Sequence, residues 1–189
     1  MENTKYCLCC GEDVPFNSVE RFERRELTCL YCGFVLDVKE LWQPPGTSEG
    51  YALIAEDSQN IREMISGVLE DRKFSAKVAA YENGLELISA YSKLLAAQAA
   101  VDVAIIDLNM PIMDGMTAAR TMRALEVQHG ILPVPIVFFS AMKADDALRV
   151  QMELLRPASY MNKGSHPDTG RLAERVEMLV GQLMKEYRK

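Results

Sequence analysis

The sequence predicts an α/β protein: a doubly wound, five-stranded parallel sheet, preceded by a small module that four cysteines hold together. From Tyr51 onward, short apolar runs alternate with stretches in which apolar residues recur every three or four positions. This is the pattern of alternating strands and helices. Upstream of Tyr51, cysteines are closely spaced in two pairs. We expect residues 1–43 to form the cysteine module, 44–50 a linker and 51–189 the α/β domain.

The composition is that of an ordinary globular protein. The chain has 189 residues, a formal charge of −6 and 49% hydrophobic residues, which fits one domain of usual size and a smaller companion. No apolar run approaches the roughly 18 residues of a membrane span, and no export signal opens the chain. We therefore expect a cytoplasmic protein without a membrane segment, in which the five cysteines form no disulfides.

The paired cysteines form two Cys-x-x-Cys-Gly knuckles. Cys7 and Cys10 precede Gly11, Cys29 and Cys32 precede Gly33, and 18 residues separate the two pairs. Two residues between thiolates allow both sulfurs to face one ion, and the glycine permits the positive φ that turns the backbone around it. The module resembles a zinc ribbon in which these four cysteines bind Zn²⁺. Reduced structural cysteines are the alternative, and the spacing does not distinguish zinc from iron.

Size explains why this module needs a metal. About 45 residues bury too little surface to fold alone, so we expect the ion to form the core of the module. Cys9 lacks both the spacing and the glycine of a ligand. We interpret it as a bystander, with competition against Cys7 as the alternative. Phe34–Val38 is predicted to form a short strand after the second knuckle.

The charge of the module argues against nucleic acid as its partner. The first 46 residues contain five Lys or Arg and eight Asp or Glu, a net charge of −3, which repels a phosphate backbone. Arg21, Arg24 and Arg25 are the feature that favours the opposite interpretation. The segment Gln43–Gly50 is rich in Pro and Gly and predicts a hinge-like linker, with Trp42 as a packing anchor beside it.

Five strands and five helices are expected in the α/β domain. We predict strands at 51–55, 77–80, 101–107, 136–139 and 158–161. We predict helices at 61–69, 85–100, 116–125, 145–155 and 168–187. Ser58 is expected to cap the first helix and Asp114 the third. The sheet is expected to have the strand order 2-1-3-4-5 of doubly wound folds.

Polar residues end four of the five predicted strands. Asp107 ends a continuous apolar run, and the other polar residues are Glu56, Asp57, Ser140 and Lys163. In open α/β sheets ligands bind beyond the carboxyl ends of the strands, so these side chains predict a site. Three carboxylates held together favour a hard divalent cation such as Mg²⁺. The alternative for Asp107 is that it only caps the next element.

In this order, these residues resemble the receiver domain of two-component response regulators, over residues 51–189. The resemblance rests on Glu56-Asp57, on the block Asp107-Leu-Asn-Met-Pro-Ile-Met-Asp-Gly115, on Ser140-Ala141, and on Tyr160 three residues before Lys163. It implies that Asp107 accepts a phosphoryl group. It also implies that Asp57, Asp107 and the carbonyl of Asn109 bind Mg²⁺ directly, and that Glu56 binds it through water.

The resemblance assigns roles to three further residues. Ser140 and Lys163 would contact the phosphoryl group, and the ring of Tyr160 would turn inward after phosphorylation; a simple core role is the alternative for Tyr160. The chain departs from the family at Gly164, where many members have proline, so the resemblance leaves open whether the preceding peptide is cis. His129 and His166 are interpreted as loop residues outside any metal site.

We expect a phosphoacceptor rather than an enzyme that turns over a substrate. Its expected partners are a histidine kinase or phosphotransfer protein, a downstream protein and a second copy of the chain. The downstream protein is expected because the chain ends with the fifth helix and leaves no room for an output domain. A Mg²⁺-dependent aspartyl-phosphate phosphatase is a second hypothesis, but the second acid of such enzymes is replaced by Asn109. A nucleic-acid-binding regulator that acts through the ribbon is a third hypothesis, and a scaffold with a vestigial site is a fourth.

Overall fold

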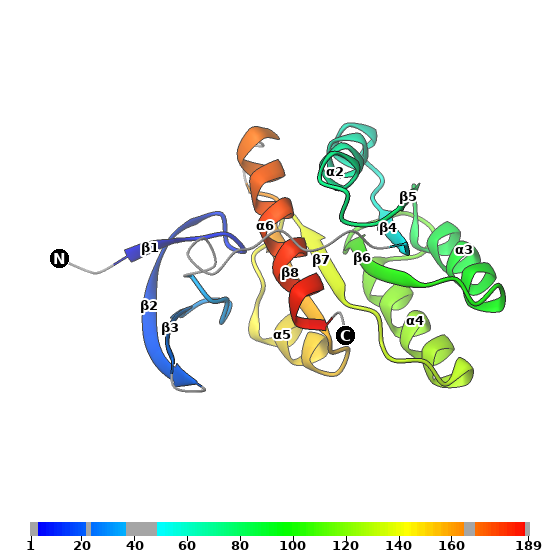
Figure 1. Ribbon diagram of the computed structural model, residues 1–189. Coiled ribbons are helices and arrows are strands. Elements are labelled where there is room, and N and C mark those ends of the chain that lie inside the picture. The colour runs from blue at the N-terminus through cyan, green and yellow to red at the C-terminus, as the bar shows by residue number, and fades with distance from the viewer. Residues whose placement is uncertain (1–3, 22–23, 37–48, 165–168, 188–189) are drawn as a thin grey trace.

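The computed structural model describes residues 4–21, 24–36, 49–164 and 169–187, and it contains two sheets (Figure 1). The N-terminal sheet is antiparallel, in the order β1-β2-β3; its strands are β1 (Thr4–Cys7), β2 (Glu12–Arg21) and β3 (Arg24–Cys29). The second sheet is parallel, in the order β5-β4-β6-β7-β8. Its strands are β4 (Tyr51–Ala55), β5 (Lys77–Tyr81), β6 (Val101–Asp107), β7 (Ile136–Ser140) and β8 (Ala158–Asn162). The predicted order 2-1-3-4-5 is confirmed.

Five helices cover the two faces of the parallel sheet. They are α2 (Gln59–Asp71), α3 (Gly84–Ala96), α4 (Gly115–His129), α5 (Asp146–Glu153) and α6 (Thr169–Tyr187). Successive side chains of a strand point to opposite faces, and the buried strand residues divide accordingly. Ile54 and Ile105 pack in one core with α2 and α6, whereas Leu53 and Ile106 pack in the other with α3 and α4. This double burial is why the strands are continuous apolar runs.

Two of the predicted helices have other limits. The helix expected to run to Ala100 ends at Ala96, because Gln98 adopts a φ of 53° and the carbonyl of Ala100 accepts a hydrogen bond from Tyr51 N at 2.9 Å. The last residues of the predicted helix therefore lead into the sheet. The helix after β6 is longer than predicted and ends at His129, with left-handed Gly130 as its C-cap.

The N-terminal module differs more from its prediction. Within the described residues, the strand expected at Phe34–Val38 is reduced to one bridge between Val35 and Thr28. Most of the module is instead the hairpin of β2 and β3, in which Phe16 pairs with Cys29. The polar sequence of this hairpin gave no strand signal. Trp42 and most of the predicted linker lie outside the described residues.

The module packs against the second half of the parallel domain. Cys7, Cys9, Val14 and Leu36 belong to the same core as the buried residues of α6, and Figure 1 places the N-terminal sheet on the α6 side of the molecule, away from α3. The amide of Asn162, the last residue of β8, donates a hydrogen bond to Cys9 O at 2.7 Å. Among the residues described, no helix combines the length and apolar character needed to cross a bilayer.

Candidate functional site

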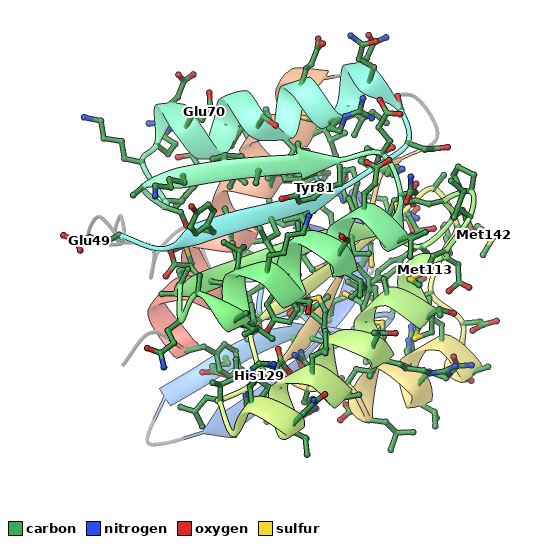
Figure 2. The ribbon with its side chains drawn as sticks, turned by 90° about the vertical axis from the view of Figure 1, so that its right-hand side faces the viewer. Glu49, Glu70, Tyr81, Met113, His129 and Met142 are labelled. Carbon is green, nitrogen blue, oxygen red and sulfur yellow. The ribbon has the colours of Figure 1, made fainter. Side chains whose placement is uncertain are left out.

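The polar residues predicted to form a site lie at one edge of the parallel sheet. Glu56 and Asp57 follow β4, Asp107 ends β6, Ser140 ends β7 and Lys163 follows β8. Figure 2 shows that the loops after β6 and β7, marked by Met113 and Met142, lie at one end of the domain, whereas Glu49, which precedes β4, lies at the other. Parallel pairing thus gathers side chains that are up to 107 residues apart in the chain.

Lys163 is the centre of this group. Its Nζ lies 2.8 Å from Asp107 Oδ2 and 2.8 Å from Glu56 Oε2. The carboxylates are almost fully buried, and the lysine side chain is 12% exposed. Burial alone would lower the pKa of Lys163, but its hydrogen bonds to Asp107 and Glu56 outweigh burial and raise it. Burial raises the pKa of Glu56, against the opposing effect of Lys163.

The carboxylates form a donor set for a divalent cation. Oxygen atoms of Glu56, Asp57 and Asp107 lie within 4.8 Å of one another. Oε2 of Glu56 is buried, and its partner among the described residues is the Lys163 ammonium 2.8 Å away. Three acids facing one cation of charge +1 leave negative charge to be neutralised, and hard oxygen donors suit Mg²⁺ or Mn²⁺. The residues therefore fit such an ion.

The loop after β6 is held by its own backbone and by a helix cap. Asn109 N donates to Asp107 Oδ1 at 3.2 Å, which orients the carboxylate. Asp114 accepts a hydrogen bond from Thr117 N at 2.8 Å as the N-cap of α4, and this bond lowers the pKa of Asp114. The predicted cap is confirmed. Ser58 occupies the N-cap position of α2, but its side chain makes no capping hydrogen bond.

The ends of β7 and β8 meet at the carbonyl of Met142. Tyr160 Oη donates a hydrogen bond to this carbonyl, and Asn162 Nδ2 donates to it at 2.6 Å. Met142 N in turn donates to Ser140 Oγ at 3.2 Å. Tyr160 is buried, with 7% of its surface exposed, and burial raises its pKa. Tyr160 and Asn162 are thus connected to Ser140 through hydrogen bonds to the backbone of Met142. The contact of Asn162 was not predicted, since an asparagine at a strand end carries no distinctive sequence signal.

The four knuckle cysteines form a second cluster. Sulfurs of Cys7, Cys10, Cys29 and Cys32 lie within 4.8 Å of one another. The Sγ atoms of Cys7 and Cys32 are 3.5 Å apart and those of Cys10 and Cys29 are 3.8 Å apart, well beyond the roughly 2.05 Å of a disulfide, and all five cysteines are free thiols. Gly11 and Gly33 have φ values of 75° and 73°, as the knuckle pattern predicts.

Backbone amides point at these sulfurs. Cys10 N donates to Cys7 Sγ at 3.4 Å, and Cys32 N donates to Cys29 Sγ at 3.4 Å. Mutual hydrogen bonds lower the pKa of Cys7 and raise that of Cys10, as expected for thiols held against one another. Four clustered sulfurs with amide donors facing them are the environment of a tetrahedral sulfur site, so the residues fit a zinc ion. Cys9 is buried and is not one of the four mutually close sulfurs, although its thiol contacts those of Cys7 and Cys32. Its carbonyl contacts the other domain.

Further sequence expectations concern residues away from both clusters. His129 ends α4 on the surface, and His166 lies outside the described residues, as do the side chains of Arg21, Arg24 and Arg25. Within the described chain, the one cis peptide is Arg156–Pro157, so the peptide between Lys163 and Gly164 is trans.

The parallel domain that carries the acidic site matches a known protein family. A sequence model of the response regulator receiver domain matches residues 52–176. The chain belongs to this family. Receiver domains act in two-component signal transduction, so the predicted family and its signalling class are confirmed. The described part of the cysteine module, residues 4–21 and 24–36, precedes the matched region.

The curated relatives that the chain matches are longer proteins. The chain is 25% identical over 168 residues to the peroxide stress-activated histidine kinase mak3 of Schizosaccharomyces pombe, covering 85% of the chain and 7% of the kinase. It is 32% identical over 95 residues to a protein-glutamate methylesterase/protein-glutamine glutaminase of Shewanella frigidimarina, covering 50% of the chain and 21% of that protein. The chain therefore spans only a small part of the length of these relatives.

Solved receiver structures share the fold. The receiver domain of the histidine kinase CKI1 from Arabidopsis thaliana, complexed with Mg²⁺ and BeF₃⁻, superposes with a TM-score of 0.57 at 20% identity, covering 70% of this chain and 91% of that chain. The Mn²⁺-bound response regulator Rcp1 gives a TM-score of 0.54 at 18% identity, covering 68% and 89%. At these identities the likeness establishes the receiver fold.

Proposed function

We propose that this protein is a response regulator that accepts a phosphoryl group on Asp107 from a histidine kinase or phosphotransfer protein and signals to a protein partner. The observation that carries this proposal is the pairing of Lys163 Nζ with Asp107 and Glu56, 2.8 Å from each. Asp57 lies beside them. Phosphoryl transfer needs little besides positioning and neutralisation of charge, and these residues provide both.

The chemistry follows from the nucleophile and its neighbours. An oxygen of the Asp107 carboxylate attacks the phosphorus of a phosphohistidine, the N–P bond breaks as the O–P bond forms, and the product is an acyl phosphate. Lys163 holds positive charge next to the acceptor. Mg²⁺, held by Asp57, Asp107 and the Asn109 carbonyl, with Glu56 through water, would neutralise the phosphoryl oxygens when bound. Hydrolysis of the acyl phosphate then ends the signal.

The signal leaves the site through the ends of β7 and β8. Ser140 would donate a hydrogen bond to a phosphoryl oxygen, and it already accepts one from Met142 N at 3.2 Å. Because Tyr160 donates to the carbonyl of that same Met142, a shift of the Ser140 loop releases the ring. Phosphorylation would thereby bias a packing change between two arrangements. The receiving surface would be read by a protein partner or a second copy of the chain.

We propose further that the N-terminal module is a zinc ribbon with Cys7, Cys10, Cys29 and Cys32 as ligands. The clustering of four sulfurs within 4.8 Å supports this. Protein purified without chelator should contain one equivalent of zinc by elemental analysis. Cys32→Ser should lower that stoichiometry, whereas Cys9→Ser should keep it, because Cys9 is not one of the four mutually close sulfurs.

The phosphoacceptor is tested by intact-mass measurement after incubation with acetyl phosphate and Mg²⁺. The wild-type protein should gain one phosphoryl group, and omission of Mg²⁺ should prevent it, because the incoming phosphate would meet an uncompensated acidic cluster. Asp107→Asn should abolish the adduct. Asp114→Asn is the matched control in the same loop, since asparagine retains the helix cap. A normal adduct on the Asp107 variant would refute the assignment.

A turnover assay separates this proposal from a phosphatase. Aspartyl-phosphate phosphatases carry a second acid two residues after the nucleophile, whereas this chain has Asn109 there. We expect the protein to consume a chromogenic phosphate monoester no faster than Asp107→Asn does. Sustained turnover by the wild-type protein alone would favour the enzyme.

A further inference from the structure

The knuckle between two proposed metal ligands is bound to the strand that leads into the acidic site. The carbonyl of Cys9 accepts hydrogen bonds from Asn162 N at 2.7 Å and from Arg175 Nη2 at 2.9 Å. Arg175 on α6 also donates to the carbonyls of Leu8 and Asn162, the latter at 2.5 Å. One guanidinium thus joins the Cys7–Cys10 turn and the end of β8.

Arg175 is a buried cation in unusual surroundings. It is 4% exposed, burial lowers its pKa, and the ion pairs of the described residues give it no carboxylate partner. A buried charge without compensation is costly. A Zn²⁺ ion with four thiolates has a formal charge of −2, so the cysteine cluster supplies the missing negative charge when it holds metal. The guanidinium lies directly against the knuckle, since a Cβ on Gly11 would lie 2.8 Å from Arg175 Nη1.

The other end of this connection reaches the acidic site through adjacent residues. Asn162 binds Cys9 through its amide and the carbonyl of Met142 through its side chain at 2.6 Å. The next residue, Lys163, donates its amide to Ser140 O at 2.7 Å and its ammonium to Asp107. Asn162, which contacts Cys9, and Lys163, which contacts Asp107, are therefore neighbours in the chain.

The switch aromatic borders the cysteine cluster as well. A cavity of about 270 Å³ between the two domains is lined by Cys10, Cys32, Tyr160 and Asn162. Lys143, beside the Met142 carbonyl that Tyr160 contacts, forms an exposed ion pair with Glu12 of β2 at 2.7 Å. The loop that follows β7 thus contacts the module directly, and a change in that loop alters the space next to two metal ligands.

We propose that Arg175 is a positioning residue that couples metal binding at the four cysteines to phosphorylation of Asp107, so that each weakens the other. This inference rests on the proposed function. A phosphoryl group on Asp107 draws Lys163 and Ser140 toward its oxygens and so disturbs the hydrogen bonds that Asn162 makes in the present arrangement. Loss of the Asn162 contact to Cys9 loosens the turn between Cys7 and Cys10, and two ligands of the ion lose their fixed spacing.

The energy of this coupling is reciprocal. If BeF₃⁻ with Mg²⁺, a stable mimic of the phosphoryl group, lowers the affinity of the protein for zinc by some factor, zinc must lower the affinity for BeF₃⁻ by the same factor. We expect a factor of about five or more, the lower limit of typical couplings between sites. Phosphorylation would then change how the module contacts the receiver domain, and a partner protein would recognise that change.

The experiment measures zinc affinity of the full chain by competition with a colorimetric chelator, with and without BeF₃⁻ and Mg²⁺. Wild-type protein should bind zinc about fivefold or more weakly when BeF₃⁻ is present. Arg175→Lys keeps a positive charge but loses the planar fork that joins three carbonyls, so its factor should fall below about two. Arg72→Lys is the matched control, because the described ion pair of Arg72 joins it to Glu177 of α6 at 3.1 Å, and it should retain the wild-type factor.

The outcomes separate this inference from the function on which it rests. Intact mass after acetyl phosphate treatment reports the acyl phosphate independently; without an adduct on the wild-type protein, the proposed function and the coupling both fail. With an adduct present, an unchanged or increased zinc affinity in BeF₃⁻ would overturn the coupling alone. A purely structural Arg175 would lower zinc affinity equally in both states and leave the factor intact in Arg175→Lys, which would also overturn it.

Discussion

Gly115 is the position at which one added methyl group should disable the acidic site. It is the first residue of α4, and its amide donates to Leu108 O at 3.1 Å. A Cβ at this position would overlap the carbonyl oxygen of Asp107 and lie 2.9 Å from its carbonyl carbon, whereas ordinary contact begins at 3.4 Å. Because the opposing atoms are backbone of the buried strand β6, α4 and the strand end must separate by roughly 1 Å to make room.

Stability and phosphorylation should both respond to this separation. Overpacking against a rigid backbone costs about 1–3 kcal/mol, so Gly115→Ala should lower the free energy of unfolding in urea by about 2 kcal/mol. A displacement of roughly 1 Å at a reacting group lowers rates by up to about 100-fold. Labelling by acetyl phosphate, followed by intact mass over time, should therefore slow by at least about tenfold.

Gly67 provides the matched control. It lies inside α2, and a Cβ there meets no atom within 4 Å. Gly67→Ala should raise the free energy of unfolding by about 0.5–1 kcal/mol, since alanine restricts the unfolded chain and favours helix. Its labelling rate should match the wild type. Wild-type stability and labelling in Gly115→Ala would refute the close approach of α4 to Asp107.

Substitutions at three further residues test the helix cap and the charges of the site. Asp114→Ala removes the N-cap of α4 and should lower the free energy of unfolding by about 1 kcal/mol, whereas Asp114→Asn should be close to wild type. The pKa of Asp114 is lowered in the folded protein. Thermal melts should therefore show the difference between wild type and Asp114→Ala at neutral pH and lose it as the pH falls through that lowered pKa. Lys163→Ala leaves Glu56 and Asp107 buried without their cation, so urea unfolding in Mg²⁺-free buffer should show a loss of about 3–5 kcal/mol, partly restored by Mg²⁺; equal stability with and without the ion would count against the shared ion pair. The pKa of Glu56 is raised by burial. On acidification from neutral pH, the Mg²⁺ affinity measured by calorimetry should therefore begin to fall before the pH reaches the usual glutamate pKa of about 4.3. The stabilising contribution of protonated Glu56 is present below its unfolded pKa and is lost as the pH rises through its raised folded pKa. Glu56→Gln should remove that step from the Mg²⁺ titration, and an unaltered step would assign it to another group.

Local pattern determined the parallel domain. The runs that end at Ala55 and Asp107 are apolar because both faces of the sheet are covered, and that burial is recorded directly in the residues. Parallel pairing then forces their polar ends to one edge, so the approach of Glu56, Asp57, Asp107 and Lys163 could be inferred without coordinates. The cysteine knuckles were predictable for a similar reason, because two-residue spacing and a following glycine are properties of the local chain.

Helix and strand limits were less predictable where distant partners decide them. Alanine favours helix, yet α3 ends at Ala96. The carbonyl of Ala100 instead accepts a hydrogen bond from the amide of Tyr51 at the start of β4. The hairpin of β2 and β3 is polar over much of its length, and the few apolar residues that it buries, Val14, Phe16 and Leu27, pack against the core shared with α6.

The residue pattern alone indicated which polar side chains meet at the edge of the parallel sheet, whereas the contact between the two domains could be known only from the folded structure. Cys9 had no visible purpose in the sequence because its part is played by its backbone carbonyl. Arg175 looked like one more polar residue of an amphipathic helix, yet it is buried against three carbonyls. Every residue carries a carbonyl, so only the relative placement of two folded units can select the ones that a buried guanidinium will bind.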